Sequence, residues 1–153
     1  MSDDTLVLEK FLPYRLSVLS NRLSAAIAES YSRRFGLTIP EWRVVAVLAL
    51  DPGISAAEVA ERTAMDKVAV SRAVRRLLAT GRARREMAAG DRRRSVLELT
   101  PEGQRIYRRI TPALRSFEAE LLAGLSAREQ RLLDAILRHL ELRAPSLAPP
   151  AID

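Results

Sequence analysis

The chain has 153 residues, of which 48% are hydrophobic and 29% are charged, a mix typical of a globular protein of one domain. It contains no cysteine and one histidine, His139, which excludes disulfide scaffolds, thiolate metal sites and cysteine nucleophiles and leaves little for histidine-based chemistry. The net charge of +6 is concentrated between Lys67 and Arg94, where ten basic and two acidic side chains give +8, against −2 for the rest. A surface of nearly one sign favours a polyanion partner, above all nucleic acid, over a merely solvated face, which usually mixes signs.

The sequence also argues against a membrane protein and an enzyme. The longest apolar run, Val44 to Leu50, is far shorter than the about 20 residues that cross a bilayer, and the acidic N-terminus lacks the basic region of a signal peptide. The acidic residues fall at helix caps and on polar faces, without a carboxylate pair placed for acid–base catalysis. We therefore expect a cytoplasmic protein with no catalytic residue, no metal site, no cofactor and no membrane partner.

The first predicted helix runs from Leu8 to Phe35 and is apolar on more than one face. One stripe recurs at helical spacing, and a second lies beside it at Phe11, Tyr14 and Val18. The first stripe consists of Leu8, Leu12, Leu16, Leu19, Leu23 and Ile27. Such a helix either runs through the core or is covered by a partner chain.

The second predicted helix begins at a capping box. Thr38 and Glu41 have the spacing of that motif, and Pro40 lies in the first turn. The helix ends near Leu50, because the turn residues 51–53 follow it.

A candidate helix-turn-helix comes next. Ser55 and Glu58 form a second capping box, which opens a short helix to about Thr63, and Asp66 is a good N-cap for a helix over 67–80. The residues expected to point inward are Val70, Ala73, Val74, Leu77 and Leu78. The residues expected to contact duplex DNA are Lys67, Val68, Ser71, Arg72, Arg75 and Arg76. In a major groove, arginine pairs with guanine, serine bonds a base or a phosphate, and lysine neutralises phosphate; the alternative is a basic face that meets only solvent.

From Arg82 to Leu99 the hydrophobic period changes from about 3.6 to 2, which predicts a two-stranded hairpin. Its long tip carries three consecutive arginines, 92–94.

Two helices complete the chain. Thr100 and Pro101 open a long helix, in which Pro112 should cause a kink. Its apolar stripe consists of Ile106, Ile110, Leu114, Phe117, Leu121 and Leu125. A third capping box, Ser126 and Glu129, opens the last helix, whose apolar residues are Leu133, Ile136, Leu137 and Leu140.

Four motifs follow one another along the chain: Gly36–Arg43, Met65–Arg72, Asp91–Arg93 and Leu99–Gly103. Each is modest alone, but their order and spacing resemble the MarR family of winged-helix bacterial transcription regulators, over roughly residues 6–142.

The resemblance implies a mainly α fold with a small β-hairpin wing (α+β). It also implies a winged helix-turn-helix protein that is dimeric, with intertwined terminal helices. Residues 1–35 and 101–143 would then form dimerisation helices, 36–100 a DNA-binding lobe, and 144–153 a frayed tail. The first predicted helix is apolar on more than one face, which is independently consistent with a partner chain that covers it.

The resemblance further implies a DxR motif in the wing, carried here by Asp91 and Arg93. In the family this arginine typically enters the minor groove and the aspartate helps to hold the wing. A cation on a thin hairpin is attracted to a narrow, A·T-rich minor groove, and Arg92 and Arg94 would then meet phosphates. Without the arginines, Asp91 would be an ordinary turn residue.

Two positions depart from the family pattern. Arg82 stands where the family usually has a leucine packed under the wing, so either its stem covers apolar surface or the wing is looser and unusually basic. The wing also begins with residues 88–90, Ala-Ala-Gly, without the acid and proline often seen there.

Family members often bind a small ligand, frequently an aromatic acid, between the dimer helices and the DNA-binding lobe. The candidates in this chain are Tyr14, Arg15, Arg22, Trp42 and Arg43. An aromatic surface with an arginine can hold an aromatic carboxylate, although the same residues could equally serve as core and interface.

The sequence thus predicts a homodimeric, DNA-binding transcriptional regulator. We expect a repressor that binds a palindromic operator in double-stranded DNA and is released by a small aromatic or phenolic acid. The alternative is a winged-helix module that acts through protein or RNA binding, without a ligand response. Binding to promoter duplex, tested against single-stranded RNA, separates the two.

Overall fold

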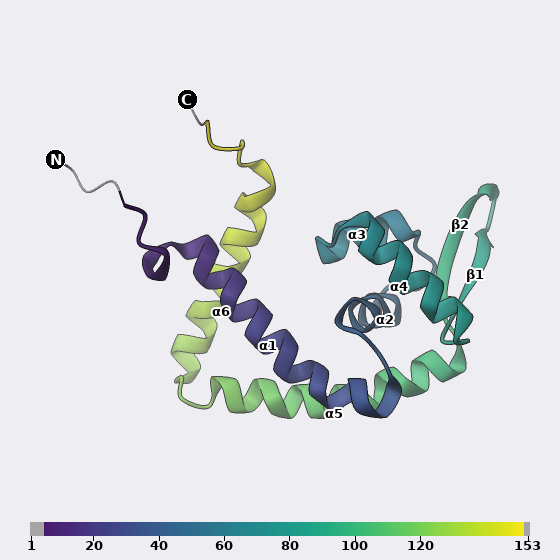
Figure 1. Cartoon of the computed structure of the whole chain (residues 1–153), viewed down its shortest axis with the longest axis horizontal. Helices are drawn as coiled ribbons and strands as arrows, with labels where there is room; N and C mark the ends of the chain where they lie inside the picture. The colour runs from purple at the N-terminus through teal and green to yellow at the C-terminus, as the bar shows by residue number, and fades with distance from the viewer. Residues whose placement is uncertain (1–4, 152–153) are drawn as a thin grey trace. The chain divides into compact units, whose positions relative to one another are not determined.

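The computed structural model describes residues 5–151, apart from the side chain of Arg92. This part of the chain folds into six α-helices, two 3-10 helices and one antiparallel hairpin (Figure 1). In chain order the elements are η1 (Leu8–Lys10), α1 (Leu12–Phe35), α2 (Ile39–Leu50), α3 (Ala56–Thr63), α4 (Lys67–Ala79), β1 (Ala83–Ala88), β2 (Asp91–Leu99), α5 (Pro101–Leu122), α6 (Ala127–Arg143) and η2 (Ala144–Ser146). The predicted fold, mainly α with a small β-hairpin, is confirmed.

The chain divides into two compact units, one that ends at Leu114 and one that begins at Arg115. The first contains α1 to α4, the hairpin and the first part of α5, and the second contains the rest of α5, α6 and η2. The helix α5 continues through Pro112, although proline has no N–H to donate to the preceding turn.

The first helix begins later than its apolar stripe predicts. Residues 8–10 form only a 3-10 turn, Phe11 is extended, and α1 starts at Leu12 with Pro13 in its first turn. Proline is tolerated there because the first N–H groups of a helix have no partner within it, whereas inside a longer helix it would remove a hydrogen bond. The prediction of one unbroken helix from Leu8 is wrong, since it gave Pro13 no weight.

The helix starts follow the predicted caps. All three capping boxes form, at Thr38, Ser55 and Ser126, with the glutamate three residues later closing each one. Asp66 accepts hydrogen bonds from the N–H groups of the second and third residues of α4. These caps fix where α2, α3, α4 and α6 begin.

The hairpin is regular at its base and irregular near its tip. Cα partners run from Ala83 with Leu99 to Met87 with Ser95, but Ala88 then pairs with Asp91. The register shift leaves residues 92–94 without partners on β1, so the long basic tip expected from the sequence is a bulge in β2.

A short extra pairing, which the sequence did not predict, ties β2 to the segment before α3. The N–H of Leu97 donates to the carbonyl of Ile54 (2.8 Å), and the N–H of Gly53 donates to the carbonyl of Leu97 (2.9 Å).

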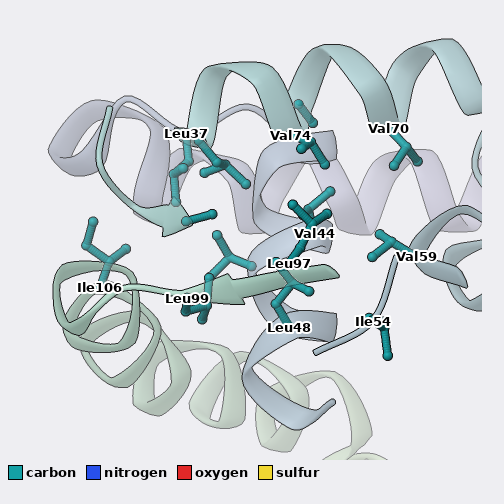
Figure 2. Close-up of a cluster of buried hydrophobic side chains, with 14 of the residues drawn as sticks. Leu37, Val44, Leu48, Ile54, Val59, Val70, Val74, Leu97, Leu99 and Ile106 are labelled. Carbon is teal, nitrogen blue, oxygen red and sulfur yellow. The ribbon is translucent and has the colours of Figure 1, made fainter. Parts of the chain in front are cut away.

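A single apolar core lies under the hairpin and helices α2 to α4 (Figure 2). In that view Leu97 and Leu99 of β2 lie against α2, near Val44 and Leu48, and Val74 of α4 approaches α2 from the other side. All five are buried. Burial of this kind is worth about 1.5–3 kcal/mol per large aliphatic side chain, and it holds α4 and the hairpin in one lobe.

Candidate nucleic-acid interface

The helix α4 separates into an apolar and a polar face, as its sequence predicts. Val70, Ala73, Val74 and Leu77 are buried and Leu78 is half-buried. The exposed side chains are Lys67, Val68, Ser71, Arg72, Arg75 and Arg76. All six residues expected to contact DNA are therefore accessible to a partner along one helix.

The turn before α4 is tight. Ala64 adopts a left-handed conformation, with φ of 51°, and the N–H of Met65 returns to the carbonyl of Ala60. The carboxylate of Asp66 caps the helix. The apolar side chain of Val68, in the first turn, is 56% exposed.

The arginines between positions 67 and 94 differ in whether their side chains already bind another residue of the protein. Arg76 pairs through Nε with Glu41, whose side chain is only 4% exposed. Arg84 pairs with Glu86 and Glu98 on the hairpin. Three further arginines, Arg72, Arg75 and Arg93, make no side-chain hydrogen bond or ion pair with any residue that the structure describes. These three have a free guanidinium for an external anion.

The wing residues of the DxR motif are joined through the backbone. The Oδ1 atom of Asp91 accepts a hydrogen bond from the N–H of Arg93 at 2.9 Å. Both side chains are exposed, and no ion pair joins them in the described structure. The side chain of Arg92 lies outside what the structure describes.

Arg94 is held by the body of the lobe. Its Nη2 atom lies 2.6 Å from Oε2 of Glu58, the capping-box residue of α3. The sequence gave Arg94 a phosphate contact, and it had no signal for this ion pair, which joins residues 36 positions apart.

The structure also settles where Arg82 lies. The residue is half-buried, and its guanidinium donates a hydrogen bond to the carbonyl oxygen of Phe35, the last residue of α1. A cation at a helix C-terminus is favourable. Arg82 therefore joins the end of α1 to the turn before β1.

A small cavity lies between α1 and α2, with a volume of about 190 Å³. Its lining residues are Ser24, Ile27, Tyr31, Ile39, Trp42 and Arg43. Of the predicted ligand residues, the cavity thus includes Trp42 and Arg43. Tyr14, Arg15 and Arg22 are exposed on α1 and do not line it.

The cavity has an aromatic wall and a basic group. Trp42 stacks on Tyr31 and on Tyr107 of α5, with ring centroids 5.5 and 5.9 Å apart. Arg43 donates to Oγ of Ser24 at 3.1 Å. Burial raises the pKa of Tyr31, and the charge of Arg43 opposes that shift.

Three residues of the cavity were not among the predicted ligand residues, although their spacing could be read from the sequence. Ser24, Ile27 and Tyr31 follow one another at spacings of three and four, which places them on one face of α1.

Among the helices that the structure describes, none combines the length and hydropathy of a membrane span. The described residues also contain no cluster of three or more His, Cys, Asp or Glu side chains arranged to ligate a metal ion.

Comparison with known proteins places these features in a family context. A model described as MarR family matches residues 35–94. The HTH-type transcriptional repressor Rv2887 of Mycobacterium tuberculosis is 30% identical over 131 residues, which cover 85% of this chain and 91% of that protein.

Two solved structures show the same fold. A MarR/EmrR family transcriptional regulator from Acinetobacter sp. ADP1 superimposes with a TM-score of 0.85 at 24% identity, covering 93% of this chain and 100% of the other. The PcaV transcriptional regulator from Streptomyces coelicolor, solved in complex with its natural ligand, gives a TM-score of 0.71 at 27% identity, covering 92% and 98%.

Proposed function

The chain belongs to the MarR family of DNA-binding transcriptional regulators, and from this premise we propose that it is a homodimeric repressor of a near-palindromic operator. Residues 36–100 form the DNA-binding lobe in this proposal, and residues 1–35 and 101–143 supply the dimer interface. Helix α4 enters the major groove, and the hairpin places Arg93 in the minor groove. Residues 144–153 take no part in either contact.

One observation carries this proposal: the exposed arginines of α4 and the wing that no residue of the described structure engages. Arg72 and Arg75 lie on α4 and Arg93 lies on the hairpin. Phosphate contacts position a protein on DNA, whereas side chains at base edges specify the sequence. Free cations on two adjoining elements supply both kinds of contact.

Selection from random duplexes tests the proposal. We expect a near-palindrome whose half-site centres lie about 10 base pairs apart, since the two-fold axis of a dimer is imprinted on its site. Fluorescence anisotropy should then show tighter binding to this duplex than to a scrambled duplex or to single-stranded RNA of the same length. Absence of a selected sequence, or a preference for RNA, would contradict the proposal and favour a module that acts on RNA.

We also propose that an aromatic carboxylate binds between α1 and α2 and releases the DNA. Support comes from the aromatic wall at Trp42, the adjacent guanidinium of Arg43 and the size of the cavity. At about 190 Å³ it is smaller than the about 300–1,000 Å³ of sites for drug-sized ligands, and so suits a single-ring compound.

The fluorescence of Trp42, the only tryptophan, reports on this cavity directly. Benzoate and its hydroxylated analogues should change its emission in a saturable way and lower the affinity for the selected duplex. Arg43→Gln should weaken that response, while Arg33→Gln, an exposed arginine of α1 outside the cavity, should leave it unchanged. A response equal in both variants would place the ligand elsewhere.

A further inference from the structure

Glu58 of α3 lies at the meeting point of a helix cap and the wing. Its Oε2 atom accepts hydrogen bonds from the N–H and the hydroxyl of Ser55, both at 2.8 Å, and from Nη2 of Arg94 at 2.6 Å. The first of these contacts and the hydrogen bond from the N–H of Glu58 to Oγ of Ser55 (3.3 Å) form the capping box of α3. The third joins this rigid cap to β2.

The contact reaches β2 where the hairpin is least supported by its own ladder. Arg94 belongs to the three residues that the register shift leaves without partners on β1. On the other side of Ser95 and Val96, Leu97 is fixed by its backbone pairing to Ile54. A two-stranded hairpin is only marginally stable without further packing, so the ion pair to Glu58 supports a segment that the sheet does not hold.

The same contact bears on Arg93, the next residue. Arg93 and Arg94 are joined directly through the backbone, so a guanidinium of Arg94 held on Glu58 also limits where Arg93 can lie. The side chain of Arg93 is exposed and is unpaired among the described residues.

We infer that Glu58 is a positioning residue for DNA binding, whose carboxylate holds Arg94 and thereby fixes the wing so that Arg93 is presented to the duplex. This inference rests on the proposed function. It assigns Arg94 to holding the wing against α3, in place of the phosphate contact that the sequence suggested.

The charge state of Glu58 suits this role. Its pKa is lowered to about 2, chiefly by the hydrogen bond from the Ser55 backbone and then by the hydrogen bonds from Arg94 and the Ser55 hydroxyl. A carboxyl with a depressed pKa keeps its contact above its ordinary range and loses it only as the pH falls toward the lowered value. The support therefore persists at any pH at which DNA binding is measured.

The sign of a mutational effect distinguishes this role from simple electrostatics. A carboxylate near bound DNA repels phosphates, so its removal should strengthen binding if charge alone matters. If the carboxylate positions the wing, its removal weakens binding although the surface becomes more positive.

Glu58→Gln is the variant that isolates the charge. Glutamine at this position of a capping box still accepts the backbone hydrogen bond, so α3 should remain folded, as a thermal melt can check. The matched control is Glu61→Gln, an exposed carboxylate of the same helix with no ion pair in the described structure. Affinity would be measured by anisotropy on the selected duplex at fixed salt, together with the dependence on salt.

We expect Glu58→Gln to weaken binding by at least about fivefold, the lower range for one lost side-chain contact to DNA, and Glu61→Gln to leave it equal or tighter. Arg94→Gln should reproduce the loss. Arg93→Ala should add little in the Glu58→Gln background, because in this proposal Arg93 acts only while Glu58 and Arg94 hold the wing, and residues that act through one network couple. In Glu58→Gln, the slope of log affinity against log salt concentration should fall by about one charge, although Arg93 is still present.

The outcomes distinguish a failure of the proposed function from a failure of the positioning role of Glu58. Wild-type protein that selects no duplex overturns the proposed function. Wild-type protein that binds its duplex, while Glu58→Gln binds it equally or more tightly, overturns the positioning role alone. A loss in Glu58→Gln that simply adds to the loss in Arg93→Ala also overturns it, since the wing arginine would then act independently.

Discussion

Arg72 and Arg76 lie about one turn apart on the exposed face of α4, yet their surroundings give them different roles. Nε of Arg76 lies 3.2 Å from the buried carboxylate of Glu41, whose other oxygen accepts the N–H of Thr38 in the α2 cap. Arg76 thus joins α4 to α2 in the protein itself. Arg72 has no such partner in the described structure, so its full hydrogen-bonding capacity is available to a base.

Replacing Arg72 should therefore change sequence preference. Arg72→Ala should cost about 1–3 kcal/mol on the selected duplex and less on a scrambled one, because a base contact discriminates and a phosphate contact does not. Anisotropy titrations on both duplexes measure this difference. Arg76→Ala serves as the comparison and should lower the free energy of unfolding in urea by about 1 kcal/mol, since the pair is largely exposed on the arginine side. Equal losses for Arg72→Ala on both duplexes would rule out base reading.

Asp91 and Arg93 provide a second test at this scale. The carboxylate of Asp91 holds the backbone of Arg93, so Asp91→Ala should weaken DNA binding through the path of the wing. Its loss should largely vanish in an Arg93→Ala background. Asp91→Asn is the control, because an amide oxygen can accept the same hydrogen bond and should preserve most of the affinity. A double-mutant cycle on an A·T-flanked duplex measures the coupling; losses that add within about 0.3–0.5 kcal/mol would show that the residues act independently.

At the scale of helices and strands, the sequence predicts features formed by nearby residues but not contacts between residues far apart in the chain. The capping boxes at Thr38, Ser55 and Ser126 involve residues three apart, so the sequence alone predicts where those helices begin. The hairpin likewise follows from the period of two between Arg82 and Leu99, whereas its register was not predicted.

The contacts that complete the candidate sites join distant residues. The hydrogen bond from Arg82 to Phe35, the ion pair of Arg94 with Glu58 and the stack of Trp42 on Tyr107 depend on tertiary packing. No spacing rule relates such positions. The sequence therefore identified the exposed basic side of α4 and the candidate cations, but not which of those cations the fold itself engages.

The junction between the hairpin and α5 leads to a prediction about packing. A Cβ atom at Gly103, in the first turn of α5, would lie 2.1 Å from the carbonyl oxygen of Arg82. Backbone cannot yield as a flexible side chain can, so Gly103→Ala should destabilise the protein by about 1–3 kcal/mol through overpacking. This effect should exceed the roughly 1 kcal/mol by which alanine favours a helix over glycine.

Urea denaturation followed by circular dichroism measures the change. Gly124→Ala is the matched control, because a Cβ atom there meets nothing within 4 Å. A Gly103→Ala variant as stable as the wild type would mean that α5 does not pack against the turn at Arg82 as described.

At the scale of the whole molecule, each unit leaves a run of large apolar side chains uncovered. In the first unit, α1 exposes Leu12, Leu16 and Leu19. In the second, the exposed large apolar residues of α6 are Leu132, Leu133, Ile136, Leu137 and Leu142. Single exposed leucines are common on soluble proteins, but contiguous apolar surface marks an interaction site. Both helices fall in the segments that the proposed dimer buries.

We predict that the protein is a homodimer and that dimerisation sets the spacing of the two half-sites it binds. Sedimentation at low micromolar protein should give about twice the chain mass of 17.0 kDa. Glutamate at both Leu16 and Leu19 should yield monomers, because charges cannot be buried unpaired in an apolar interface. The control is Leu50→Glu, at a position 73% exposed at the end of α2 and outside the proposed interface; it should remain dimeric.

The monomeric variant keeps α4 and the wing intact, so it should still bind one half-site weakly while losing the dependence on half-site spacing that a dimer imposes. If the doubly substituted protein stays dimeric, or if it becomes monomeric and still binds the full palindrome as tightly as wild type, the interface is not where the exposed leucines of α1 place it.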